Sequence, residues 1–462
     1  MRVRGAPPDA LIRGLDQIRT DVGIPTGFRP EVTAAADAAA VRPVGAEHVD
    51  RTGERFVTLD PESSVDLDQA FAIEIAGADV ILHYAIADVG WFVRPGDALD
   101  REAFERAVTV YLPDQRATLY PPVLSEGAAS LLPSVDRPAV VFTVRVAEDG
   151  ITRIEEVQRA IIRNRAKLAY DAVAPADLPP GFDEVHRRIE RAETARGAPR
   201  VEFPEQEIDC HDDGRFALTF RPRLVSEEQN AALSLATNLA VAEALFEAGT
   251  GLFRVMPDVD EHRFRRLRHS ARAFGLDWPA NVPLDAFERS LPRDDPRTSA
   301  FLLAVRRAAG GAGYEPYRSG QRPWHSAVAA TYAQATAPLR RLQDRYVIEA
   351  MLSIAAGRPV LEEIEIAFGE LPAAMSRGSQ KANQAERQAL DLAEAVFLSG
   401  REGEIFDAVV IDEGEWGVEV QIARPAVVAR VEARRVDPGD GLRVRLIAVD
   451  VERREIRFER VS

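Results

Sequence analysis

Apolar and polar positions alternate with a period of two over several stretches in the first third of the chain. Three of these are R-F-V-T-L-D at 55–60, F-A-I-E-I at 71–75 and V-I-L-H-Y-A-I-A-D at 80–88. Two more alternating segments follow at 139–146 and 151–159. Because the side chains of a strand point alternately to its two faces, this period predicts the strands of a sheet.

The second half of the chain changes to helical spacing. Ser226 opens the sequence S-E-E-Q, which fits a capping box with Gln229, and apolar residues then recur on one face. The same spacing predicts further helices at 10–20, 260–274, 297–309, 338–355 and 373–398. Strands followed by helices indicate an α+β fold.

Alternation returns after residue 403 in about five short strands. Five strands in roughly sixty residues are typical of an OB-fold β-barrel, which often binds single-stranded nucleic acid. A generic small barrel without such a ligand fits the same pattern. We therefore expect a small helical segment at 1–50, a mixed sheet packed by helices at 51–400 and a five-stranded OB-fold barrel at 401–462.

The composition is ordinary for a soluble globular protein, with 46% hydrophobic and 29% charged residues among 462. The sequence contains no apolar run of about eighteen residues, and no apolar segment follows the first charged residues, so we expect neither a membrane span nor a secretory signal. Cys210 is the only cysteine, which excludes an intramolecular disulfide. A cytoplasmic location fits best.

The formal net charge of −16 argues against a polyanionic partner over most of the surface. The balance reverses between residues 301 and 350, where seven arginines stand against three acidic residues. This local excess of positive charge predicts one focused site for an anion.

Three aspartates, Asp60, Asp66 and Asp68, fall within nine positions of the segment T-L-D-P-E-S-S-V-D-L-D-Q. Carboxylate oxygens are the ligands that Mg²⁺ prefers, and two carboxylates at i and i+2 of an extended chain face the same way. A solvated acidic loop is the alternative. A second D-x-D at Asp258 and Asp260 shows that the spacing alone is weakly specific.

Further segments change that balance. I-A-D-V at 86–89, V-Y-L-P at 110–113 and T-A-P-L-R-R-L at 336–342 follow the aspartates in order. With T-L-D and D-L-D-Q, this ordered set resembles the ribonuclease II (RNB) family of exoribonucleases from about residue 56 to 398. The C-terminal barrel resembles the RNA-binding OB fold that closes such enzymes.

The resemblance implies a 3′→5′ exoribonuclease that hydrolyses single-stranded RNA to nucleoside 5′-monophosphates by a two-metal mechanism. Mg²⁺ is the expected cofactor, with Mn²⁺ as the alternative ion, and single-stranded RNA is the expected partner. No protein partner is indicated.

The resemblance also assigns residues. Asp60, Asp66 and Asp68 take the places of metal-binding and catalytic aspartates, with Asp68 in the catalytic role. Tyr111 matches a tyrosine that stacks on nucleotides near the 3′ end. Arg340 matches an arginine that contacts the scissile phosphate.

Two further residues complete the expected RNA contacts. Arg341 adjoins Arg340 in the same motif. Glu228, near the start of the helix from Ser226, is our choice for the acidic active-site residue of the family.

Departures from the family pattern leave an alternative open. The family's fourth aspartate is Gln69 here, whose amide oxygen can ligate Mg²⁺ but cannot act as a base. Ala337 and Leu342 replace the more common serine and tyrosine. A catalytically inactive RNA-binding protein of the same fold is therefore the rival expectation.

The resemblance further implies a short form without the cold-shock barrels that precede the catalytic domain of full-length relatives, because only about fifty residues precede residue 55. For such a form we expect a wider entrance and more tolerance of structured RNA.

Overall fold

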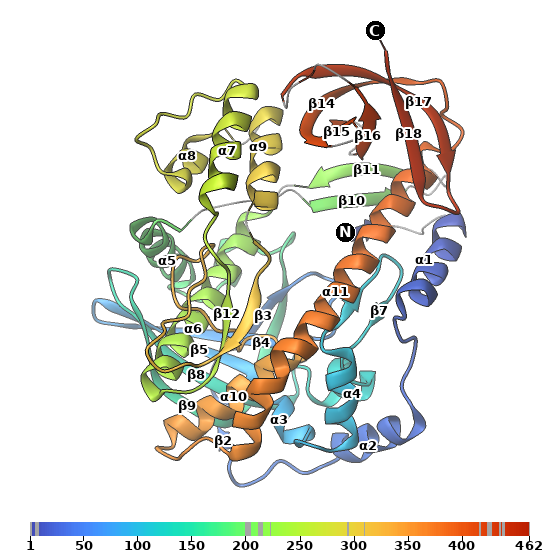
Figure 1. Ribbon diagram of the computed structural model, residues 1–462. Helices are drawn as coiled ribbons and strands as arrows, with labels where there is room; N and C mark the ends of the chain where they lie inside the picture. Colours follow the sequence, from blue (N-terminus) through green and yellow to red (C-terminus); the bar gives the residue numbers. More distant parts are fainter. Residues whose placement is uncertain are drawn as a thin grey trace.

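The computed structural model describes residues 2–4, 9–198, 205–210, 216–221, 223–292, 295–308, 310–414, 417–422, 427–433, 436 and 439–461. A curved mixed sheet packed by helices forms the larger part, and a closed barrel follows it (Figure 1). The predicted α+β fold with a C-terminal five-stranded barrel is confirmed.

The strands of the large sheet lie in the order β2-β9-β3-β4-β5-β8. The long strand β9 pairs with β8 along its first part and with β3 along its last part, so the sheet curls back on itself. The bounds of the strands in this sheet are β2 Val49–Asp50, β3 Phe56–Asp60, β4 Gln69–Ala76, β5 Asp79–Ala87, β8 Asp136–Val146 and β9 Thr152–Ala169.

The remaining strands form smaller sheets and the barrel, whose order is β14-β15-β16-β18-β17. Their bounds are β1 Arg2–Arg4, β6 Val110–Tyr111, β7 Arg116–Ala117, β10 Glu205–Cys210, β11 Phe216–Arg221, β12 Leu252–Val255, β13 Gly313–Pro316, β14 Ile405–Gly414, β15 Gly417–Ile422, β16 Val427–Glu432, β17 Gly441–Asp450 and β18 Glu455–Val461.

The α-helices of the described chain range from one turn to ten turns in length. Their bounds are α1 Asp9–Val22, α2 Pro30–Ala40, α3 Val89–Phe92, α4 Ala98–Arg106, α5 Phe182–Arg196, α6 Val225–Ala248, α7 Glu261–Ala273, α8 Leu284–Ser290, α9 Pro296–Ala308, α10 Leu342–Ala355 and α11 Glu362–Leu398.

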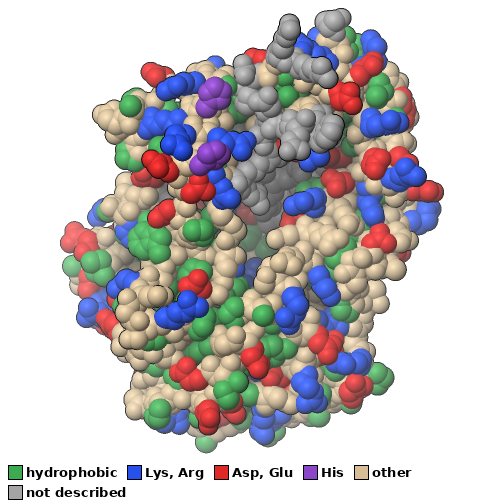
Figure 2. Space-filling model, viewed as in Figure 1, with side chains coloured by type: hydrophobic (Ala, Val, Ile, Leu, Met, Phe, Trp, Pro, Cys, Tyr) green, Lys and Arg blue, Asp and Glu red, His purple; other side chains and the backbone are tan. Residues whose placement is uncertain are grey.

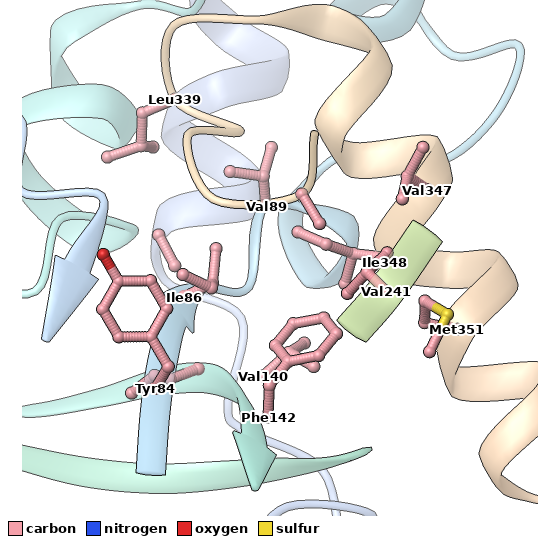
Figure 3. Close-up of a cluster of buried hydrophobic side chains, with 14 of the residues drawn as sticks. Tyr84, Ile86, Val89, Val140, Phe142, Val241, Leu339, Val347, Ile348 and Met351 are labelled. Atoms are coloured by element: carbon pink, nitrogen blue, oxygen red, sulfur yellow. The ribbon is translucent and has the colours of Figure 1, made fainter. Parts of the chain in front are cut away.

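The main core lies between the sheet and helices α6 and α10 (Figure 3). Phe142 on β8 pairs with Tyr84 on β5, and this layer meets Val241 of α6 and Met351 of α10. Helix α6 is, among the described helices, the one with the length and hydropathy that could cross a bilayer, and half of its most apolar window is buried in the protein. Its apolar character is therefore explained by packing on the sheet.

Helix α11 connects the two parts of the molecule (Figure 1). It extends from the larger domain to the barrel, and helix α1 packs beside it, with Leu11, Leu15 and Leu392 in one hydrophobic cluster. Gly378 marks the crossing with α4, because a Cβ there would lie 2.6 Å from the Cβ of Ala107. The N-terminal helix thus shares one core with α11 and the barrel.

Several sequence predictions need correction. The helix expected at 373–398 begins at Glu362 and continues through Pro372. The proline removes a single backbone hydrogen bond, and the buried side chains of Leu371 and Met375, before and after it in the sequence, hold the helix in the core. The capping box expected at Ser226 is displaced: the backbone N–H of Leu224 donates to the carboxylate of Glu227 at 2.8 Å.

The arginines between residues 301 and 350 whose side chains the structure describes do not form one patch. Arg345 is buried and donates to Asp100, while Arg341 binds Asp344. Arg322 pairs with Glu243. The side chains of Arg306 and Arg307 lie outside the described residues. Arg340 is the member of this set that reaches the predicted aspartates.

Candidate active site

Two adjacent strand ends assemble the predicted aspartates. Strand β3 ends at Asp60 and strand β4 starts at Gln69, and the two strands are antiparallel. The loop between them therefore returns to its own starting point, carrying Asp66 and Asp68. Backbone bonds fix the end of this loop, since Leu131 N–H donates to Leu67 C=O at 3.0 Å and Ala87 N–H donates to Asp68 C=O at 2.9 Å.

Asp68 binds the arginine motif from the far end of the sequence. Its carboxylate accepts the backbone N–H of Leu339 at 2.8 Å and the Nε–H of Arg340 at 3.0 Å. Helix α10 was expected from residue 338 but begins at Leu342, because the preceding turn directs these donors at Asp68. The structure thus joins two motifs that are about 270 residues apart.

The aspartates lie within electrostatic range of one another. Burial is the largest cause that raises the pKa of Asp68; with the opposing effects of Arg340 and the Leu339 N–H and the added rise from the Asp66 charge, the net pKa is about 7. Burial likewise raises the pKa of Asp60 to about 6, with Arg340 opposing and Asp66 reinforcing the shift. The Asp66 charge acts on both Asp60 and Asp68, and a cation nearby would relieve this repulsion.

Asp66 is held by a short hairpin. Arg116 of β7 donates to one carboxylate oxygen at 2.6 Å, and the Tyr111 hydroxyl of β6 donates to the other at 3.2 Å. Arg116 also pairs with Glu126 at 3.1 Å. The Tyr111 side chain is 51% exposed, so its ring is available to stack on a base.

The N-terminal helix supports this hairpin from behind. Arg19 of α1 is buried and donates to the carboxylate of Asp114, in the turn between β6 and β7. The Asp114 carboxylate also accepts the backbone N–H of Gln115 at 2.9 Å. Arg19 therefore connects α1 to the turn that carries Tyr111 and Arg116.

Gln69 lies beside the aspartates, and its amide oxygen accepts the hydroxyl of Tyr84. Burial raises the pKa of Tyr84 well above its usual value, Tyr170 and Asp60 reinforce the rise, and Arg340 opposes it. Tyr84 therefore remains a neutral donor and holds the oxygen of Gln69.

Sequence reasoning missed several polar residues of the site. Asn230 of α6 donates to the C=O of Leu59 at 3.2 Å and to the hydroxyl of Tyr170 at 2.8 Å, next to Asp60. Tyr84 stands in β5 and Tyr170 directly follows the end of β9, and both look like core residues in the sequence. Their tyrosine hydroxyls were the available signal, because a buried hydroxyl needs a partner.

The remaining assigned residues lie as follows. Arg341 uses its Nε and Nη2 atoms on Asp344 at 3.0 and 2.6 Å. Glu228 lies in the first turn of α6 with its side chain partly exposed. The second D-x-D has a local role, since Asp260 caps α7 by accepting the N–H of Arg263 at 2.8 Å.

The donor chemistry of the site fits a hard divalent cation, since three aspartates and an amide oxygen supply oxygen ligands. As the side chains stand, no three His, Cys, Asp or Glu groups of the described residues are close enough together to hold an ion. Arg116 and Arg340 occupy the carboxylates of Asp66 and Asp68 instead. A cation here would replace part of that positive charge.

Comparison with known families finds two matches along the chain. A model described as RNB domain matches residues 49–355, and one described as RNase II-type exonuclease C-terminal S1 domain matches residues 404–461. Ribonuclease R of Aquifex aeolicus is 26% identical over 100% of this chain and 72% of its own length. The chain spans 63% and 54% of the ribonuclease R sequences from Thermotoga maritima and Lactococcus lactis.

Solved structures agree in fold. The apo form of Mycoplasma genitalium RNase R superposes with a TM-score of 0.86 at 19% identity, covering 98% of this chain and 78% of that one. The same protein in complex with ribose-methylated single-stranded RNA and with double-stranded RNA gives TM-scores of 0.86 and 0.83. Yeast Ssd1, a pseudonuclease, gives a TM-score of 0.70 at 18% identity, covering 94% of this chain and 57% of its own.

These solved structures establish the fold and not the chemistry, because they include both a ribonuclease and a pseudonuclease. The family assignment rests on the sequence models, which cover more than half of the chain and include every motif that first indicated the resemblance. The chain therefore belongs to the ribonuclease II (RNB) family.

Proposed function

We propose that this chain is a 3′→5′ exoribonuclease that hydrolyses single-stranded RNA to nucleoside 5′-monophosphates. One observation carries the proposal: buried Asp68 binds both the Leu339 N–H and Arg340, which unites the aspartate motif with the arginine motif. A family member that had lost its chemistry would have no need to keep a carboxylate buried at this cost.

Arg340 and Tyr111 have separate roles in the proposed reaction. The Nε–H of Arg340 donates to Asp68. The side chain remains 43% exposed, so its terminal nitrogens can donate to a phosphate oxygen. Tyr111 offers an exposed ring on which a base near the 3′ end can stack. Arg340 then stabilises the charge that develops on the phosphorus centre.

Asp60, Asp66 and Asp68 would hold the divalent ions, with the amide oxygen of Gln69 as a further ligand. A pair of such ions, Mg²⁺ or Mn²⁺, would supply an activated water and neutralise charge on the phosphate. A dication near Asp60 and Asp68 would favour their ionised forms and so oppose the rise in pKa that burial causes.

The test uses 5′-labelled single-stranded RNA with Mg²⁺ or Mn²⁺ and with EDTA. We expect a ladder that shortens from the 3′ end and release of nucleoside 5′-monophosphates, which chromatography identifies. Asp68→Asn should bind the RNA without shortening it. Products that carry 3′-phosphates, or cleavage that persists in EDTA, would contradict the metal-dependent mechanism.

The rival function is RNA binding without hydrolysis. It is favoured by Gln69, which replaces a family carboxylate, and by the likeness in fold to a protein described as a pseudonuclease. In that case the wild-type chain would retard RNA in a gel and leave its length unchanged with either metal.

We also propose tolerance of structured RNA, which the same assay can measure with a hairpin that bears a 3′ overhang. Mycoplasma genitalium RNase R, a neighbour in fold, has been solved with double-stranded RNA. Digestion that proceeds to the duplex or through it would support the proposal. A stop several nucleotides before the duplex would oppose it.

A further inference from the structure

Helix α7 carries an exposed basic face that the candidate active site does not use. Four exposed residues repeat at intervals of three, four and three positions, which places them on one side of the helix: His262, Arg265, His269 and Arg272. The buried residues Leu267 and Ala271 lie on the other side. At 1.5 Å per residue this face is about 15 Å long.

Other arginines of α7 have structural roles. Arg268 donates to the carbonyl oxygens of residues 278, 279, 280 and 282 and lies over the ring of Trp278, 4.0 Å from its centroid. Arg263 pairs with Asp260 and donates to the C=O of Ala308. These contacts hold α7 against the end of α9 and against the segment 278–282.

Arg265 and Arg272 differ from these, because neither side chain makes an ion pair or hydrogen bond with the described part of the chain. Two free guanidinium groups, seven residues apart on one helical face, therefore form a local positive surface on an acidic body.

Helix α7 lies between the larger domain and the barrel. The segment before the helix belongs to the larger domain, since Met256 N–H donates to Trp324 C=O at 3.1 Å. The end of the helix meets the barrel, where a Cβ on Gly439 would lie 2.3 Å from Ala273 C=O. Ile411 of the barrel is buried in the hydrophobic cluster that α7, α8 and α9 form, and Val428 of the barrel packs against that cluster.

Helix α7 therefore forms a fixed bridge between the domain that holds the aspartates and the C-terminal barrel. Figure 2 shows Lys, Arg and His side chains gathered over α7, next to the hollow in the middle of this face. The basic face of α7 therefore belongs to an element that contacts both the larger domain and the barrel.

We propose that the exposed face of α7 is a docking surface for the phosphate backbone of single-stranded RNA. The identity of the polyanion rests on the function proposed above. Guanidinium groups bind phosphate oxygens without reading the base, so the surface contributes affinity that is independent of sequence and sensitive to salt. Its role is to guide the strand between the barrel and Asp68.

The test compares the wild-type chain with a double variant, Arg265→Gln with Arg272→Gln. Anisotropy of a labelled single-stranded RNA is measured in EDTA, where no hydrolysis occurs, over a series of KCl concentrations. Each lost phosphate contact lowers the slope of log Kd against log salt by about 0.7, so we expect the slope to fall by about 1.4 and binding at low salt to weaken severalfold.

A matched control removes the same charge elsewhere. Arg13 and Arg153 are also exposed and without a bonded partner among the described residues, so Arg13→Gln with Arg153→Gln should leave the slope unchanged. A charge-preserving variant, Arg265→Lys with Arg272→Lys, should restore the wild-type slope. Melting temperatures of the variants report any damage to the fold.

The outcomes are separable from those for the nuclease proposal. If the wild-type chain binds RNA without hydrolysing it, the nuclease proposal fails and the α7 surface is still tested by its slope. A double variant that binds RNA with the wild-type affinity and slope would overturn the docking surface. So would a wild-type chain that does not bind RNA at all.

Discussion

Replacing the carboxylate of Asp68 should stabilise the protein while it abolishes turnover. Asp68 is 4% exposed, and burial raises its pKa from 3.8 to about 7. Asp68→Asn keeps the volume of the side chain and an oxygen that accepts the Leu339 N–H. The asparagine thus resembles the protonated aspartate that the folded protein favours.

The magnitude follows from proton linkage. The folded-state pKa is above the unfolded value, so the ionised carboxylate destabilises the fold, by an amount that grows as pH rises from 3.8 and is complete above about 7. Three pKa units at 1.36 kcal/mol each give about 4 kcal/mol at pH 8, and little more than one unit remains at pH 5, which gives about 1.7 kcal/mol. The variant should gain stability mainly at high pH.

Thermal or urea unfolding of both proteins at pH 5 and pH 8, in EDTA, measures this difference. Asp37 on α2 is exposed, and Asp37→Asn provides the control that should change stability equally little at both pH values. The same Asp68→Asn protein should bind RNA and lose turnover by orders of magnitude. A variant that is no more stable than wild type at pH 8, or that retains near-native activity, would refute the reasoning.

Three further outcomes are expected. Arg19→Ala removes the partner of Asp114 behind the hairpin, and it should cost about 3 kcal/mol of stability and raise the KM for RNA more than it lowers kcat. Replacement of the exposed Arg13 by alanine should have neither effect. Equal kinetics for the two variants would exclude a positioning role for Arg19. Gln69→Asp adds a carboxylate to the site and should lower the Mg²⁺ concentration needed for half-maximal rate; an unchanged requirement would place residue 69 outside the metal shell. Tyr111→Ala should weaken RNA binding by about 1–3 kcal/mol through lost stacking, measured by anisotropy in EDTA, and Tyr111→Phe should preserve most of it.

The sequence by itself determined the fold class, the barrel and the family. Strand and helix periods follow local hydrophobic patterning, because burial of one face acts on each element separately. The ordered motifs predicted Asp60, Asp66, Asp68, Tyr111 and Arg340 as candidate site residues before any of their contacts were visible. Where the local pattern predicted an element wrongly, tertiary packing had overridden it. Helix α11, for example, continues through Pro372 because its buried neighbours stabilise the helix there.

Only the tertiary structure decided which charges meet. The local sequence does not say which carboxylate each arginine of the motif binds: Arg340 reaches Asp68, whereas Arg341 binds Asp344 three residues away. The support of the hairpin by Arg19, the hold of Tyr84 on Gln69 and the bridge formed by α7 likewise join residues or elements that are distant in sequence. Electrostatic and hydrogen-bonding partners depend on distances of a few ångströms, and those distances are set by the packing of the whole chain.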